Sequence, residues 1–193
     1  MTSPSLNARP SAQSNDVRHH LLDEYRQVRQ RTEAICRPLV TEDYGIQTMQ
    51  DVSPPKWHLA HVSWFFETFL LLPFSKGYQV FHPRYDDLFN SYYETHGKPF
   101  PRPQRGLLSR PTVAEIYRYR AHVDDALEEL IGALDERHWP TFAERLILGL
   151  HHEQQHQELL FTDIKHIYAF NPLRPAYQER SSVLSSASPG GID

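Results

Sequence analysis

The sequence predicts an all-α protein, an up-and-down four-helix bundle with a long ordered loop between its second and third helices. Apolar residues recur at helical spacing in four segments, and no segment shows the alternation of a convincing strand. The chain has 193 residues, of which 39% are hydrophobic, enough for one domain with a core. We expect the bundle to span residues 14–177, between a disordered arm at 1–13 and a disordered, Ser- and Gly-rich tail at 178–193.

The first two predicted helices differ in their patterns. The first has its N-cap within residues 14–16, presents an apolar stripe that includes Tyr25 and Ile35, and ends before Pro38. The second spans residues 56–72 and is apolar almost all round, which is typical of a central, buried helix. It is preceded by Ser53-Pro54-Pro55, which resembles an N-cap followed by first-turn prolines.

The second half of the chain predicts a loop and two more helices. Residues 73–111 are rich in Pro, Tyr and Phe and keep no period, which predicts a long ordered loop. Thr112 and Glu115 have the spacing of a capping box, and a helix follows to about Leu134. The fourth helix is expected from about residue 141 to residue 170, where Asn171-Pro172 ends it.

Composition excludes several classes of protein. The net charge of −4 and the pI near 6.3 give no electrostatic reason to expect binding to nucleic acid or to an anionic membrane. The one cysteine, Cys36, cannot form an internal disulfide, and the sequence shows neither an apolar signal region nor a stretch of roughly 20 apolar residues. We therefore expect a cytoplasmic protein.

Histidine spacing points to a metal. His152 and His156 lie one turn apart on the same side of the fourth predicted helix, so two imidazoles face inward together. Burying both rings without partners costs a few kcal/mol each, whereas one divalent metal satisfies both lone pairs. The third ligand is expected to be His61, in the middle of the apolar second helix, with His58 as the competitor. Three neutral histidines leave open coordination positions, which suits Fe(II), Zn(II) or another borderline metal.

Other interpretations of the histidines remain open. A single histidine on an apolar face is more often a core residue bonded to a carbonyl, which we favour for His58, His122 or His166 taken alone. Residues 152–156 also spell H-E-x-x-H, the zinc metallopeptidase motif in which Glu153 would be the general base. We disfavour a peptidase because little sequence follows to supply a third ligand, and because no substrate-binding strand is evident.

Five segments in order resemble a known family, the N-terminal, DinB-like half of the ergothioneine-biosynthesis sulfoxide synthases. The resemblance covers about residues 15–177 and is carried by residues 53–61 (SPPKWHLAH) with 64–67 (WFFE), 89–94 (FNSYYE), 105–111 (RGLLSRP), 151–158 (HHEQQHQE) and 171–177 (NPLRPAY). It implies a DinB-like fold and a non-haem Fe(II), oxygen-dependent enzyme. Such an enzyme joins a cysteine-type thiol, cysteine or γ-glutamylcysteine, to C2 of the imidazole of hercynine and oxidises the sulfur to a sulfoxide. The family pattern places the iron on His61, His152 and His156.

The resemblance also implies a second domain of formylglycine-generating type, which closes the site and supplies the catalytic tyrosine. The sequence given ends at Asp193 without resembling the start of that domain, so we expect a truncated or split form that binds metal but does not turn over alone, with a separate chain as the candidate partner that supplies the domain. One alternative is a free-standing DinB-like thiol transferase using the same ligands with zinc or nickel. Another is a non-catalytic scaffold stapled by a metal.

Several charged residues are further candidates for the site. Arg105 and Arg110 could bind a substrate carboxylate in a forked geometry, although pairing with surface carboxylates is at least as plausible. Asp163 shares the helix face of the two histidines and could orient a ligand imidazole by accepting its distal N–H. Glu67 and Glu158 are candidates for the same role, and helical phase favours Asp163 over Glu158, which points well away from that face.

Overall fold

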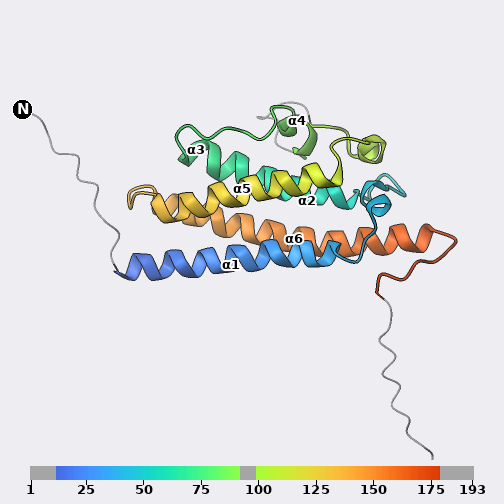
Figure 1. The fold of residues 1–193 in the computed structure, drawn as a ribbon, viewed down its shortest axis with the longest axis horizontal. Helices are drawn as coiled ribbons and strands as arrows, with labels where there is room; N and C mark the ends of the chain where they lie inside the picture. Colours follow the sequence, from blue (N-terminus) through green and yellow to red (C-terminus); the bar gives the residue numbers. More distant parts are fainter. Residues whose placement is uncertain (1–11, 92–98, 179–193) are drawn as a thin grey trace, which may run out of the picture.

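The computed structural model describes residues 12–91 and 99–178, and these residues form a helical bundle with no strand among them. Four long helical segments run side by side (Figure 1). They are α1 (Ala12–Cys36), α2 (Pro55–Phe66), α5 (Val113–Ala133) and α6 (Trp139–Phe170). The all-α four-helix bundle is thus confirmed. The expected disordered arm and tail lie outside the described residues, apart from residues 12–13 and 178.

Connections fix the directions of the helices. A short helical turn, η1 (Thr41–Gly45), links α1 to α2, and α6 follows α5 closely. The long connection between α2 and α5 carries the chain back along the bundle, so that α2 and α5 run in the same direction (Figure 1). The alternation of directions predicted from the sequence is therefore interrupted once. This arrangement places α2 antiparallel to α6 and in contact with it.

The buried helix α2 is central, as predicted. All its residues from Pro55 to Phe66 are buried, and the helical path continues through a π-helical segment, η2 (Glu67–Leu71), into α3 (Leu72–Phe74). The predicted N-cap Ser53 is wrong, because Pro54 occupies that position and no side chain caps the helix. Ser53 Oγ instead accepts a hydrogen bond from Arg105 at 3.0 Å.

Helix starts also differ from the expected bounds. Helix α1 already includes Ala12, ahead of the expected N-cap, and α6 begins at Trp139, about two residues early, because a proline is tolerated in the first turn of a helix. The capping box of α5 is confirmed: Thr112 Oγ1 accepts from the backbone N–H of Glu115 at 3.2 Å, and the Glu115 carboxylate accepts from the N–H of Thr112 at 2.7 Å.

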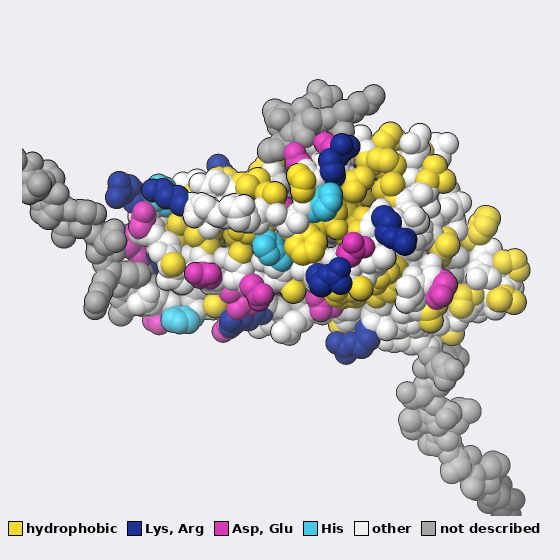
Figure 2. Space-filling model, turned by 45° about the horizontal axis from the view of Figure 1, so that its top comes forward, with side chains coloured by type: hydrophobic (Ala, Val, Ile, Leu, Met, Phe, Trp, Pro, Cys, Tyr) yellow, Lys and Arg dark blue, Asp and Glu magenta, His cyan; other side chains and the backbone are white. Residues whose placement is uncertain are grey.

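The described part of the long connection is ordered, as predicted, and contains two short helices. These are α4 (Tyr85–Phe89) and η4 (Arg102–Leu107), which lie on the α2 and α5 side of the bundle (Figure 1). On the face shown in Figure 2, hydrophobic and histidine side chains are interspersed with charged groups of both signs. Among the described residues, no helix is both long enough and apolar enough to cross a membrane.

Candidate metal site

Three histidine side chains from two helices converge inside the bundle. His61 comes from α2, and His152 and His156 come from consecutive turns of α6. One ring nitrogen from each lies within 4.8 Å of those of the other two, and the Nε2 atoms of His61 and His152 are 3.2 Å apart. The histidines chosen from the sequence are therefore brought together as a group that could hold one metal ion.

Close packing of α2 against α6 makes this convergence possible. Gly149 of α6 faces Phe66 of α2, and a Cβ atom at Gly149 would lie only 2.5 Å from the Phe66 ring. A side chain at this position would force the two helices apart. His152 follows Gly149 by about one helical turn, so the narrow contact lies directly beside the histidines.

His61 is held in one orientation by its surroundings. Its Nδ1 atom lies 2.5 Å from the carbonyl oxygen of Phe89 in α4 and donates to it, which leaves the lone pair on Nε2 facing His152. The imidazole is stacked between two indoles: Trp57 at 4.5 Å between ring centroids and Trp64 at 5.6 Å. These contacts fix both the ring plane and the tautomer before any ligand binds.

His58 is adjacent to the group but is bonded elsewhere. Its Nε2 lies 2.9 Å from Oδ2 of Asp163, and its Nδ1 lies 2.9 Å from Nδ1 of His156. His58 is therefore a buried core residue, as predicted, but its partners are a carboxylate and an imidazole rather than a carbonyl. Asp163 does face the site as predicted, and it contacts His58 rather than one of the three grouped histidines.

His152 has an open side. It is half-buried, packs on Phe65 at 4.6 Å between ring centroids, and borders a surface depression that is also lined by Leu148 and Gln155. Its Nδ1 atom is buried without a hydrogen-bond partner. Of the three histidines, His152 therefore lies closest to an approach from solvent.

Burial keeps all three imidazoles neutral. Loss of hydration lowers the pKa of His61 and of His156, and proximity to the other histidines lowers both further. Burial likewise lowers the pKa of His152 to about 4. Neutral rings offer lone pairs, which a metal requires, so the three nitrogens are ready to coordinate at neutral pH.

These residues fit a divalent transition metal. The donor set is three neutral nitrogens from imidazole, a ligand that suits iron, zinc, copper and nickel. Nε2 of the buried His61 faces Nε2 of His152 at 3.2 Å, and a shared cation would satisfy both lone pairs at once. Three protein ligands leave positions for an exogenous ligand, as in catalytic sites.

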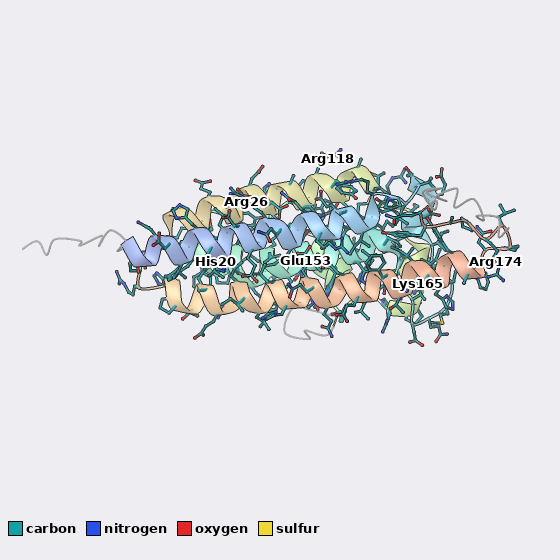
Figure 3. All side chains as sticks on the ribbon, turned by 90° about the horizontal axis from the view of Figure 1, so that it is seen from below. His20, Arg26, Arg118, Glu153, Lys165 and Arg174 are labelled. Carbon is teal, nitrogen blue, oxygen red and sulfur yellow. The ribbon has the colours of Figure 1, made fainter. Side chains whose placement is uncertain are left out.

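Glu153 is not available as a general base. It is fully buried, and its carboxylate bonds to Arg29 at 2.9 Å, Arg120 at 3.2 Å and Thr32 at 2.7 Å. Figure 3 shows Glu153 between the helices of the bundle. Because these partners come from α1 and α5, the carboxylate points away from the histidines, and the metallopeptidase interpretation of H-E-x-x-H is disfavoured.

The two arginine candidates differ in position. Arg105 is buried, and its guanidinium lies 3.3 Å from the ring centroid of Trp57, which itself stacks on His61. Arg110 is exposed and donates to the carbonyl oxygen of Ser109 at 3.1 Å. The structure thus brings Arg105 into the wall of the site and leaves Arg110 at the surface, where its role stays a prediction.

Glu67 and Glu158, the other two candidates for orienting a ligand imidazole, do not contact the three histidines. Glu67 accepts from the hydroxyl groups of Tyr78 and Tyr119, both at 2.7 Å, and from the backbone N–H of Phe81 at 3.2 Å. It anchors the connection between α2 and α5. Glu158 is exposed on α6, as its helical phase indicates.

Two features of the site were not predicted from the sequence. The carbonyl oxygen of Phe89 carries no signature in its residue type, and only the fold of α4 brings it to His61. Trp57 could have been found, because it precedes His61 by four residues, the spacing of neighbours on one helix face.

Fold and site together define a four-helix bundle with a candidate three-histidine metal centre. The family model of the DinB superfamily matches residues 24–160, so the chain belongs to the DinB superfamily. The matched region contains His61, His152 and His156. No curated protein matches the chain with significant similarity.

Proposed function

We propose that the protein binds Fe(II) through His61, His152 and His156 and forms the iron-binding half of an ergothioneine-biosynthesis sulfoxide synthase. The observation that carries the proposal is the convergence of three neutral imidazole nitrogens within 4.8 Å, inside a bundle of the DinB superfamily. The particular reaction is supported by the five sequence segments that resemble that family, two of which contain the three histidines.

The atoms and electrons of the proposed reaction balance with one molecule of O₂. Hercynine and the thiol each lose a hydrogen as the C–S bond forms, and one O₂ supplies the oxygen atom of the sulfoxide and is otherwise reduced to water. Bound Fe(II) would supply the one-electron chemistry with oxygen and a position that polarises the thiol. The chain's own residues would hold the ion, orient its ligands and shield the buried side of the site from water.

The burial of the three histidines fits a site that substrates reach from one side. His61 and His156 are buried, whereas His152 is half-buried at the depression that Phe65 and Leu148 help to line. Substrates are therefore expected to approach over His152. Arg105, stacked on Trp57, supplies positive charge beside the site for the carboxylate of an amino-acid substrate. A domain of formylglycine-generating type is proposed to complete the substrate pocket.

The test is a binding experiment with an activity arm. Protein reconstituted anaerobically with Fe(II) is titrated with cysteine, γ-glutamylcysteine and hercynine, and the absorption of a nitric oxide complex of the iron is recorded. A shift on adding thiol, absent in His156→Ala, supports the proposal. Sulfoxide formation after admission of oxygen, alone or with a candidate partner domain, is measured by mass spectrometry.

Other outcomes would replace the proposal. Zinc or nickel retained after aerobic purification, with no response of the iron form to thiol or hercynine, would favour the thiol transferase. Metal binding with no response to any of these ligands would favour a non-catalytic scaffold.

A further inference from the structure

We propose that Asp163 and His58 act in series as positioning residues that hold the Nδ1 proton on His156 and so make Nε2 of His156 the ligand atom. This inference rests on the proposed metal site. It also assigns His58, the competing ligand candidate, a role outside the coordination sphere.

The chain of contacts begins at Asp163. Its Oδ2 atom lies 2.9 Å from the backbone nitrogen of Ser53 and 2.9 Å from Nε2 of His58. The backbone N–H can only donate, so Oδ2 is an acceptor, and Nε2 of His58 carries the proton that it donates to the same oxygen. Asp163 thereby selects the tautomer of His58.

The selected tautomer of His58 then dictates that of His156. In a neutral imidazole that donates from Nε2, the other nitrogen, Nδ1, is an acceptor. Nδ1 of His58 lies 2.9 Å from Nδ1 of His156, so the latter must donate. His156 keeps its lone pair on Nε2, the nitrogen at the far end of the ring from His58.

His61 reaches the same state by another route. The carbonyl oxygen of Phe89 accepts from Nδ1 of His61, and its Nε2 faces His152. Two of the three grouped histidines are therefore oriented through Nδ1–H by acceptors outside the group. Partners of this kind orient metal ligands and raise their basicity, and their loss typically costs about 10–100-fold in metal affinity.

His58 and Asp163 are well placed to act as a rigid support. Both side chains are buried, at 3% and 7% exposure, and they join α2 to α6 one turn beyond His61 and two turns beyond His156. A histidine inserted between carboxylate and ligand extends the usual carboxylate–histidine–metal arrangement by one ring.

The first experiment reads the tautomer directly. Long-range ¹H–¹⁵N NMR correlations of the metal-free protein should show His156 with its proton on Nδ1. In Asp163→Asn, whose amide can donate to His58, the proton of His156 should move toward Nε2. Glu144→Gln, a charge-matched change at an exposed position of α6, should leave the spectrum unchanged.

The second experiment measures Co(II) affinity by visible absorption. Asp163→Asn and His58→Leu should weaken binding by about 10–100-fold without changing the stoichiometry, and His58→Asn, which restores an oxygen acceptor near the position of Nδ1, should recover part of the loss. Glu144→Gln should bind as wild type. Circular dichroism verifies that each variant is folded.

Several results would overturn the inference. These are an Nε2–H tautomer of His156 in the metal-free wild type, unchanged Co(II) affinity in Asp163→Asn, or loss of stoichiometric binding in His58→Leu, which would make His58 a ligand. Failure of the wild type to bind Co(II) would refute the metal site itself. In that case Nε2 of His156 has no ligand role, and the tautomer measurement tests only the chain of hydrogen bonds from Asp163 through His58; if instead a variant does not fold, the tautomer of the wild type decides the inference.

Discussion

Glu153 and Arg29 form a buried ion pair in the centre of the bundle, with 2.9 Å between Oε2 of Glu153 and Nη1 of Arg29. Arg120 bonds to the other carboxylate oxygen at 3.2 Å. The two arginines come from α1 and α5, so one residue of α6 is tied to both helices. Because Glu153 lies between His152 and His156 in the sequence, this tie fixes the rotation of α6 that turns the histidines toward α2.

Removing the Glu153 carboxylate should therefore be strongly destabilising. Glu153→Gln removes the fully buried carboxylate that pairs with both guanidinium groups and leaves them only the more exposed carboxylates of Asp124 and Glu33, so we expect a cost of up to about 3–5 kcal/mol. Urea unfolding followed by circular dichroism measures the change. Glu158→Gln, at an exposed position of the same helix, should change the free energy of unfolding by less than about 0.5 kcal/mol. A Glu153→Gln protein as stable as the wild type would contradict the structural role.

Two glycine substitutions should have opposite effects. Gly149→Ala places a methyl group against the Phe66 ring at the α2–α6 contact, and overpacking of this kind typically costs about 1–3 kcal/mol. Gly132→Ala, in α5, meets no atom within 4 Å and should stabilise the protein by up to about 1 kcal/mol. Thermal unfolding of the two variants gives the comparison. Equal effects would mean that the close approach of α2 and α6 is wrong.

The metal-free protein should lose stability as the pH falls from 6.5 to 5. Burial lowers the pKa of His61 and His156 in the folded state, whereas an unfolded histidine titrates near 6.5. Below that pH the unfolded state binds more protons, so the free energy of unfolding falls, by about 1.4 kcal/mol per pH unit for each such histidine. Unfolding in chelator at pH 7 and pH 5.5 measures the loss.

The buried histidines and the buried carboxylate affect stability in different pH ranges. Glu153, whose pKa is lowered by Arg29 and Arg120 against the opposing effect of burial, contributes stability that is lost only below about pH 4.5. In His61→Phe the loss between pH 7 and 5.5 should be smaller than in the wild type. Identical stability of the wild type at both pH values would rule out buried, neutral histidines.

Metal binding should be visible in tryptophan fluorescence. The Trp57 ring stacks on His61 with 4.5 Å between centroids and an angle of 11°, so a paramagnetic ion such as Co(II) on His61 would lie close enough to quench it. Titration of the wild type should reduce the emission in proportion to the bound metal. Because Trp64 also stacks on His61, the double variant Trp57→Phe/Trp64→Phe, which keeps Trp139, should bind the ion with a clearly smaller fractional loss. Equal fractional quenching in the double variant would place the ion elsewhere.

Helical periodicity and histidine spacing were sufficient for the bundle and for the grouping of His61, His152 and His156, because both depend on which face of a helix a residue occupies. The other features of the site depend on tertiary contacts between residues far apart in the sequence. The acceptor of His61 is a backbone oxygen, and the position of Ser53 depends on Arg105, far along the chain. Glu153 satisfied a short motif, but its buried arginine partners could not be identified from local spacing.

The most direct test of the account is the stoichiometry of divalent metal binding, measured by anaerobic titration with Fe(II) and with Co(II). We expect one ion per chain in the wild type and in His151→Ala, a control at an exposed histidine next to His152. We expect loss of stoichiometric binding in His61→Ala, His152→Ala and His156→Ala. Unchanged binding in these three variants, or no binding by the folded wild type, would contradict the proposed metal centre.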